Sequence, residues 1–324
     1  MAQPVTFYTT TSKISGVALD VRKKLMFVAE DDGCIYQTSL DLTVKAEKKE
    51  VICQKNGMNH KPLLLSVDWL NEHLYIMGET NHHESWIISR CDFEGKKHII
   101  AVGGLNGKPS HIDVDPYNGY LFWIIPKDVV DSGLYRLDLG EISNGIKHET
   151  KPFQMIKGSD LGAFVVQYTR FRLLVPYQNE NTIYAVSLNG KDREDIRKNT
   201  QSPLLHSVKS LAITNNVFIW TNGHEILKEE YHQQRNSYYH NSYPDASNTS
   251  MVAVCVNSTS VQPIPVPVNP PHSCQALLGS TRAKVSWQSP QLLGDQGKGA
   301  FRVSFQLFRV KFFFVSECQK FHDF

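Results

Sequence analysis

The chain has 324 residues, and its 34 Lys and Arg against 32 Asp and Glu leave a formal net charge of +2. With 41% apolar and 20% charged residues, the composition excludes an intrinsically disordered chain, and the near-neutral charge is a poor match for nucleic acid or an acidic membrane surface. No apolar run reaches the ~18 residues of a membrane span, since the most apolar stretch, 301–315, contains Arg302, Arg309 and Lys311. The first residues lack the basic and apolar regions of a signal peptide. We therefore expect a globular protein with no nucleic-acid partner, no membrane span and no secretion signal in this chain.

An apolar run rich in aromatic residues recurs along most of the chain. The runs begin at Met26, Leu74, Leu121, Leu173 and Phe218, so their starts are separated by 48, 47, 52 and 45 residues. A short apolar strand precedes each run, and a third strand follows four of them. Dipeptides such as Asp32-Gly33 and Asn118-Gly119 lie at the junctions, and these form tight hairpin turns. Four antiparallel strands in about 45 residues is the size of one blade of a β-propeller.

The predicted fold class is all-β, a β-propeller with five clear blades and an incomplete sixth blade. Helical periodicity over ~11 residues is not evident. The second strand of each unit carries bulky side chains, which in a propeller fill the space between neighbouring blades. This pattern favours inter-blade packing over an aromatic ligand cage for Phe27, Tyr75, Phe122, Trp123, Leu174 and Trp220. The sixth blade has two interpretations: Val5–Thr10 is its outer strand, or Val5–Thr10 pairs with Met251–Val256 to close the ring.

One repeat carries a recognisable motif. Val114–Trp123 resembles the strand, turn and motif of the low-density-lipoprotein-receptor class B repeats, the Tyr-Trp-Thr-Asp (YWTD) propellers. Val67–Tyr75 keeps the same interval from Asp to motif, and Ile219–Asn222 is similar to the second half of the motif, whereas Ile76-Met77-Gly78 departs from it. The chain is identified as a degenerate member of this family over residues 14–256. That family closes its ring with six blades.

A change of composition follows the last repeat. Five prolines between Gln262 and His272 predict a stiff extended connector, and residues 275–279 and 283–287 are typical of two strands. These strands resemble the opening of a fibronectin type III domain, in which Trp287 is the buried anchor. We predict a β-propeller over residues 1–261, a Pro-rich linker over 262–272 and a partial fibronectin type III domain with an atypical C-terminal tail over 273–324.

The tail offers one more strand. Phe301, Val303, Phe305 and Leu307 alternate with polar residues, as in a strand with one buried face. A complete fibronectin sandwich needs about seven strands and roughly 90 residues, which is more than the chain supplies after the linker. The domain is therefore predicted to be truncated.

A propeller followed directly by a fibronectin module resembles the ectodomain of the Ros and sevenless receptor tyrosine kinases. The resemblance implies an extracellular, ligand-binding module on the outer side of the plasma membrane, with a protein ligand and no cofactor. The chain has no Gly-x-Gly-x-x-Gly loop, no His-Arg-Asp and no Asp-Phe-Gly. We therefore predict that this chain is not an enzyme, although the receptor it resembles would be a tyrosine kinase.

Two kinds of surface site are predicted. Asn248 and Asn257 begin Asn-x-Ser/Thr sequons, which suits a glycosylated extracellular chain. Residues 228–250 are polar, show no periodicity and are predicted to form a surface insertion that can be removed without loss of stability. We expect its tyrosines to anchor a protein partner, together with the loops 56–61 and 81–85. These tyrosines are Tyr231, Tyr238, Tyr239 and Tyr243.

The alternative function is a β-propeller hydrolase with a metal ion in its central channel. Asp20, Asp68 and Asp115 end inner strands, where a channel metal and a general base would lie, but their repetition favours hydrogen bonds to turn amides. His82-His83-Glu84 is the best metal-like cluster, yet adjacent strand residues point to opposite faces. Gly103–Gly107 is read as a loop between blades, and the six cysteines are spaced too widely for a zinc ribbon. We predict no catalytic residue and no metal site.

Overall fold

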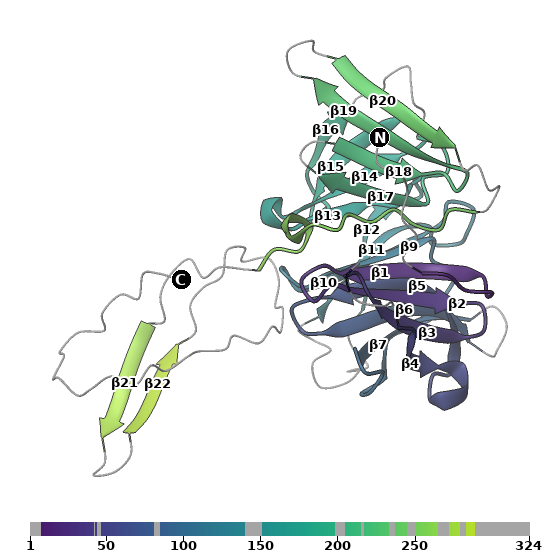
Figure 1. Ribbon diagram of the computed structural model, residues 1–324. Helices are drawn as coiled ribbons and strands as arrows, with labels where there is room; N and C mark the ends of the chain where they lie inside the picture. Colours follow the sequence, from purple (N-terminus) through teal and green to yellow (C-terminus); the bar gives the residue numbers. More distant parts are fainter. Residues whose placement is uncertain are drawn as a thin grey trace.

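The computed structural model describes residues 8–41, 43, 47–80, 85–139, 151–197, 205–214, 217–232, 237–244, 250–264, 272–278 and 283–288 (Figure 1). Regular structure within these ranges is β-strand, apart from three short 3₁₀ turns. The turns are η1 (Gln54–Asn56), η3 (Tyr168–Arg170) and η5 (Thr259–Val261). The all-β prediction is confirmed.

Five four-stranded antiparallel sheets follow one another along the chain, and we number them as blades 1 to 5. Blade 1 contains β1 (Ile14–Asp20), β2 (Leu25–Glu30), β3 (Cys34–Ser39) and β4 (Lys49–Cys53). Blade 2 contains β5 (His60–Asp68), β6 (His73–Thr80), β7 (Trp86–Asp92) and β8 (Ile99–Leu105). Blade 3 contains β9 (His111–Asp115), β10 (Tyr120–Ile125), β11 (Gly133–Asp138) and β12 (Phe153–Lys157). Blade 4 contains β13 (Val165–Gln167), β14 (Arg172–Tyr177), β15 (Thr182–Ser187) and β16 (Arg193–Arg197). Blade 5 contains β17 (Ser210–Thr214), β18 (Val217–Thr221), β19 (Glu225–His232) and β20 (Ser237–Pro244).

The order of strands within each blade is the order of the chain, as expected for hairpins that run from the axis outward. The aromatic-rich runs found in the sequence are the second strands β2, β6, β10, β14 and β18. Asp32-Gly33 and Asn118-Gly119 lie at turns, and both glycines have positive φ, at 84° and 80°. Glycine has no Cβ, so it adopts this conformation at little cost. The five-blade propeller is confirmed.

Two segments that were read as loops are strands. Residues 228–250 include most of β19 and all of β20, so the prediction of an insertion loop was wrong. Gly103 and Gly104 belong to the end of β8, where the register with β7 shifts between Ile88 and Trp86. A glycine at the bulge allows the φ of +65° that Gly104 adopts.

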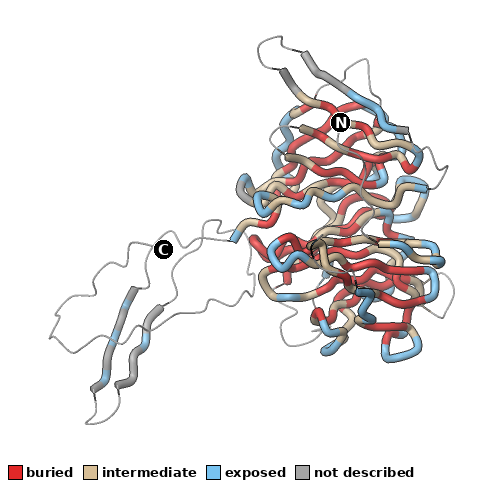
Figure 2. Tube along the Cα trace, viewed as in Figure 1, coloured by how far each residue is buried: buried red, intermediate tan, exposed pale blue. Residues whose placement is uncertain are grey.

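Apolar side chains fill the spaces between neighbouring blades, and Figure 2 shows the buried residues along the strands. Successive residues of a second strand point to opposite neighbours: Leu74 and Ile76 belong to the core between blades 1 and 2, and Tyr75 and Met77 to the core between blades 2 and 3. Two more cores join blade 3 to blade 4 and blade 4 to blade 5. The six aromatic and aliphatic residues predicted to pack between blades are all buried: Phe27, Tyr75, Phe122, Trp123, Leu174 and Trp220.

Irregular chain occupies the sector between blade 5 and blade 1. Residues 251–262 cross this sector, and Figure 1 shows them passing between the fifth and first sheets. Neither interpretation of Val5–Thr10 gains support from the described residues 8–10, which form no strand, and the hydroxyls of Tyr8 and Thr10 donate to Glu30 of blade 1. Residues 5–7 lie outside the described residues.

A separate hairpin follows the linker. It consists of β21 (His272–Leu278) and β22 (Ala283–Gln288), which pair antiparallel. The two predicted strands of this region are thus confirmed. The side chain of Trp287 and the predicted strand 301–307 lie outside the described residues.

Candidate functional site

The three aspartates proposed for a channel metal are structural. The Asp20 carboxylate accepts hydrogen bonds from the amides of Arg22 and Lys23 at 3.0 and 2.9 Å. In the same way, the Asp68 carboxylate accepts hydrogen bonds from the backbone amides of Leu70 and Asn71 at 3.1 and 2.8 Å.

The third aspartate, Asp115, closes the same kind of turn. Its carboxylate accepts the backbone amide of Asn118 at 2.9 Å and the side-chain amide at 2.7 Å. Burial raises the pKa of the Asp115 carboxyl to about 7. Each of the three carboxylates therefore satisfies turn amides that no strand can reach, and none of them lines the central channel.

The central channel is a cavity of about 500 Å³. The first strands of all five blades line it, and residues 252–256 and 260–263 complete its wall. Its one carboxylate among the described lining residues is Asp113, which is two positions before the predicted Asp115. Asp113 Oδ1 accepts from Ser66 Oγ and from the Val114 amide, both at 2.9 Å. Burial raises the pKa of this carboxyl to about 7, and these hydrogen bonds oppose the rise.

A thiol and an imidazole also lie in the channel wall. The Cys255 side chain is exposed to the solvent of the channel, but the surrounding ring of protein raises the pKa of its thiol to about 11, and the nearby Asp113 charge contributes to the rise. The thiol is protonated at neutral pH and is a weak nucleophile. Burial lowers the pKa of His111 to about 4, and its ring packs edge-on against Phe164 at 4.8 Å between centroids. These groups do not form a three-ligand metal cluster among the described residues.

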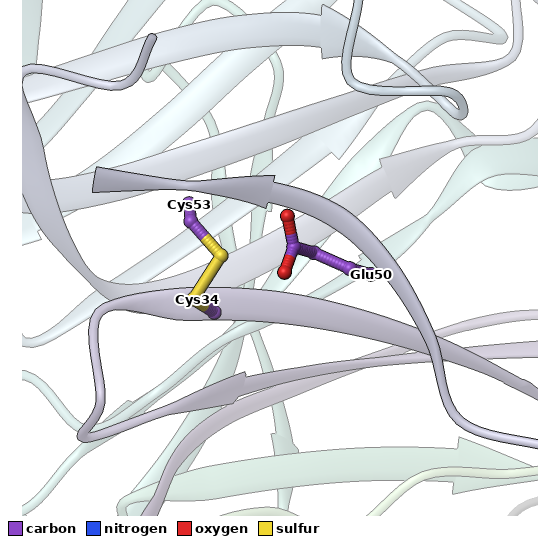
Figure 3. Close-up of side chains that lie close together, drawn as sticks. All are labelled: Cys34, Glu50 and Cys53. Carbon is purple, nitrogen blue, oxygen red and sulfur yellow. A yellow bond between two sulfur atoms is a disulfide. The ribbon is translucent and has the colours of Figure 1, made fainter. Parts of the chain in front are cut away.

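The group that does bring three potential ligands together is a disulfide and not a metal site. The sulfur atoms of Cys34 and Cys53 and a carboxylate oxygen of Glu50 lie within 4.8 Å of one another (Figure 3). The sulfurs of Cys34 and Cys53 are bonded, so neither is a thiolate that could bind a cation. The two cysteines are direct partners across β3 and β4, with Cα atoms 4.0 Å apart. The disulfide therefore locks the outer edge of blade 1.

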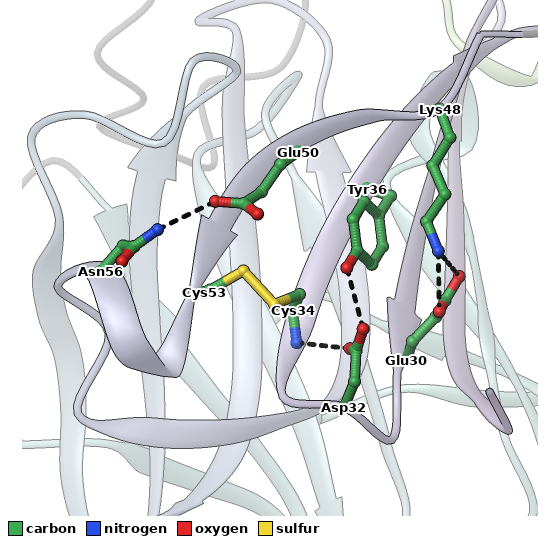
Figure 4. The surroundings of a disulfide bond; sticks show 8 residues. All are labelled: Glu30, Asp32, Cys34, Tyr36, Lys48, Glu50, Cys53 and Asn56. Atoms are coloured by element: carbon green, nitrogen blue, oxygen red, sulfur yellow. Dashed lines mark hydrogen bonds and ion pairs between the residues drawn. A yellow bond between two sulfur atoms is a disulfide. The ribbon is translucent and has the colours of Figure 1, made fainter.

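Polar contacts surround this disulfide (Figure 4). Asp32 accepts from the amide of Cys34 at 3.0 Å and from the hydroxyl of Tyr36 at 2.8 Å. Glu50 accepts from Asn56 at 3.0 Å. The loop 56–61 was predicted to contact a partner. It is shorter than predicted, because β5 already begins at His60. Its residues Asn56, Gly57 and Asn59 are exposed.

A glutamine closes one end of the ring. Gln262 is 8% exposed, and its side chain accepts from the Val21 amide at 2.8 Å and donates to the Leu19 carbonyl at 2.7 Å. Arg22 donates to the Gln262 carbonyl at 2.8 Å, and the indole of Trp69 donates to the Pro263 carbonyl at 3.0 Å. The start of the predicted linker is therefore fixed to blades 1 and 2, and this contact joins residues about 240 positions apart in the chain.

A serine and a histidine that the sequence analysis did not single out lie together in blade 2. His60 Nε2 lies 3.1 Å from Ser89 Oγ, and His60 Nδ1 lies 3.2 Å from Asn59 Oδ1. The arrangement has the form of a nucleophile, a base and an orienting group. Ser89 and His60 are both 0% exposed, so no substrate reaches the hydroxyl. The pair fixes β5 against β7.

The predicted surface residues are only partly described. Tyr243 lies on β20 and is 45% exposed, and Asn257 is exposed in the irregular chain between blades 5 and 1. In the backbone register, Tyr231 is opposite Tyr238 and Tyr239 is opposite Glu230. Asn248 and His82-His83-Glu84 lie outside the described residues.

The sequence of the chain was compared with known proteins. No family model matches it. The proto-oncogene tyrosine-protein kinase ROS of Gallus gallus is 22% identical over 296 residues, which are 89% of this chain and 12% of that protein. The ROS protein of Mus musculus is 25% identical over 86% of this chain and 11% of its own length, and the protein sevenless of Drosophila melanogaster is 25% identical over 74% and 9%. The homologues of this chain are Ros and sevenless receptor tyrosine kinases. The chain spans only 9–12% of the length of these relatives.

Solved structures share the propeller architecture. A chain of a nidogen/laminin complex matches 75% of this chain and 84% of its own length, with a TM-score of 0.56 and 14% identity. A gluconolactonase from Xanthomonas campestris matches 76% of this chain and 80% of its own length, with a TM-score of 0.53 and 13% identity. At these identities the likeness concerns the fold alone. Within the described part of the chain, no helix is long and apolar enough to cross a bilayer.

Proposed function

We propose that this chain is an extracellular interaction module of a Ros/sevenless-type receptor, which binds a protein ligand and has no catalytic activity of its own. The observation that carries the proposal is that Ros and sevenless proteins match 70–89% of the chain. A propeller also suits this role, because rigid blades hold exposed turns in fixed positions where a partner can bind them. In this proposal the propeller covers residues 1–261, the linker 262–272 and a partial fibronectin type III domain 273–324.

Two local features support an extracellular location. The Cys34–Cys53 disulfide is typical of oxidising compartments, since cytosolic thiols are kept reduced. Asn257 is exposed, and Thr259 at the third position of its sequon is exposed as well. Both residues are therefore accessible to modification in the secretory pathway.

We expect glycosylation of the native protein at Asn257. Mass spectrometry of tryptic peptides is expected to find a glycan on Asn257 that is lost in Thr259→Ala, which keeps the asparagine but destroys the sequon. Asn222 does not begin an Asn-x-Ser/Thr sequon and serves as the internal control. An unmodified Asn257 together with reduced Cys34 and Cys53 in the native protein would contradict the extracellular assignment.

A channel hydrolase is the second candidate, because Asp113 places a carboxyl with a raised pKa in the cavity and the gluconolactonase shares the fold. Among the described residues, Asp113 belongs to no group of three potential metal ligands. We therefore expect calorimetric titration with Ca²⁺, Mn²⁺ and Zn²⁺ to give no stoichiometric binding that Asp113→Asn removes. Tight binding of one ion that depends on Asp113 would favour the hydrolase over the interaction module.

A further inference from the structure

The channel along the propeller axis is large enough for a small organic molecule. Its volume of about 500 Å³ lies within the roughly 300–1,000 Å³ of typical ligand pockets. Most of its lining residues are apolar, among them Val67, Phe164 and Leu211. Asp113, the one carboxylate among the described lining residues, is half-buried, so part of its surface faces the channel. The channel thus combines apolar walls with one acidic group.

Neutral donors hold the Asp113 carboxylate in place. Ser66 Oγ of β5 and the Val114 amide of β9 donate to Asp113 Oδ1 at 2.9 Å each. The Val166 amide of β13 donates to the same carboxylate. Ser66 is 5% exposed, and its hydroxyl oxygen accepts from the Val114 amide at 2.9 Å. Donors from blades 2, 3 and 4 therefore fix this carboxylate where the three blades meet the channel.

The positive side chains among the described lining residues lie at the two ends of the channel. Lys209 precedes β17 and Arg170 follows β13, and the first strands of a propeller run in the same direction along the axis. Neither charge contributes to the pKa of Asp113, which burial raises to about 7. An enclosed carboxylate held by neutral donors favours a positively charged ligand, because the ligand supplies a counter-charge.

An aromatic ring and a thiol lie near this carboxylate. Burial raises the pKa of both Tyr168 and Cys255, and the charge of Asp113 raises each of them further, which places both groups close to Asp113. Tyr168 packs edge-on against Trp69 at 4.8 Å between ring centroids, and both residues line the channel. Aromatic rings accommodate the apolar part of an organic cation and attract its charge.

We propose that the channel binds a small organic ammonium ion with an apolar body, for which Asp113 is the counter-charge. The ammonium group donates to the carboxylate, and the apolar body lies against Trp69 and Tyr168. One carboxylate suits an ammonium ion, whereas a metal ion needs several ligands, and the charge of Asp113 disfavours an anion. The site depends on the channel alone and not on the assignment to a receptor.

Calorimetric titration of the full chain at pH 8, where the Asp113 carboxyl is mostly ionised, tests the site with three probes of similar size. These are 2-phenylethylamine, the neutral 2-phenylethanol and the anionic 3-phenylpropanoate. We expect the amine to bind one-to-one and roughly tenfold more tightly than the alcohol, and the anion not to bind. Asp113→Asn keeps the size of the side chain and removes its charge, so it is expected to weaken amine binding by roughly tenfold. Glu94→Gln changes an exposed acidic residue outside the channel and is the matched control, with unchanged affinity.

Chemical labelling of Cys255 tests the same charge preference in the unmodified chain. Its thiol is exposed to the channel and lies near Asp113. Relative to their rates with a free thiol, we expect the cationic 2-aminoethyl methanethiosulfonate to react roughly tenfold faster than the anionic 2-sulfonatoethyl reagent. Asp113→Asn is expected to remove this difference, and 2-phenylethylamine is expected to slow the labelling. Peptide mass spectrometry measures the labelled fraction at Cys255.

Four results would overturn the proposal. Equal affinity for the amine and the alcohol would show that the channel selects an apolar shape and not a charge. Unchanged amine binding in Asp113→Asn would place the ligand elsewhere, and displacement of the amine by Zn²⁺ would assign Asp113 to a metal site. Failure of all three probes to bind would remove the site. If Asp113→Asn does not fold, the labelling of the unmodified chain decides: equal rates for the two reagents, or no protection by the amine, would also overturn the proposal.

Discussion

Replacing Glu229 with Gln is expected to lower the free energy of unfolding by about 3–5 kcal/mol, because the change leaves a buried guanidinium without its counter-charge. Arg197 of β16 and Glu229 of β19 are both 0% exposed, and two parallel hydrogen bonds of 2.6 and 3.0 Å join them between blades 4 and 5. Arg197 also donates to the Asn181 carbonyl at 2.9 Å. Urea unfolding followed by Trp fluorescence measures the loss.

A matched control lies on the same strand. Lys228 and Glu230 of β19 form an exposed pair 3.4 Å apart, and Lys228→Met is expected to cost less than about 1 kcal/mol. The double variant Arg197→Met with Glu229→Leu is expected to recover most of the stability, since apolar residues need no counter-charge. A loss in Glu229→Gln as small as that in Lys228→Met would show that blade 5 is not held by this ion pair.

The second large effect concerns pH. Burial, with a smaller contribution from the charge of His98, lowers the pKa of His60 to about 4 from an ordinary value of 6.5. The imidazole is enclosed by Ser89, Asn59 and the stacked ring of His98 at 5.6 Å between centroids. Its folded-state pKa is depressed, so between pH 6.5 and 4 the unfolded chain binds a proton that the folded chain does not. The contribution of neutral His60 to the free energy of unfolding is complete above pH 6.5. About 3 kcal/mol of it is lost as the pH falls to 4.

Two carboxyls of blade 3 have the opposite effect. Burial raises the pKa of Asp113 and of Asp115 to about 7, so stability from these groups is lost as pH rises from 3.8 to 7. The pH profile of the unmodified chain therefore combines both trends. The difference between the unmodified chain and His60→Asn isolates the histidine, and it is expected to change by about 3 kcal/mol between pH 7 and 4. Exposed His224→Asn is the control, and a parallel profile for both variants would show that His60 titrates normally.

The sequence predicted the repeat well where each blade carries its own signal. The aromatic runs at Phe27, Tyr75 and Trp123 recur at nearly constant spacing, because every blade must fill the same gap to its neighbour. Asn-Gly and Asp-Gly turns located the hairpins for a similarly local reason. The turn role of Asp68 and Asp115 was also readable, since a carboxylate at a strand end accepts amides within three residues.

Other features could not be read from local patterns. The outer strands of blade 5 alternate poorly in hydrophobicity, because Glu229 is buried through an ion pair with Arg197, 32 residues earlier, rather than through apolar contact. The sequence analysis therefore took β19 and β20 for a loop. Asp113 was missed because its channel position follows from the direction of an inner strand and not from its neighbours. The Cys34–Cys53 pairing depends on the register of β3 and β4, which spacing alone left open.

The sequence by itself determined the number of blades, the bulky second strands and the turns, since each of these depends on contacts within about 45 residues. Only the tertiary structure decided how the ring is joined, through Gln262 on the turn of blade 1 and residues 251–256 in the sector between blades 5 and 1. The physical reason is that ring closure brings together groups about 240 residues apart. Their hydrogen bonds depend on where five twisted sheets place them, and no local periodicity records that position.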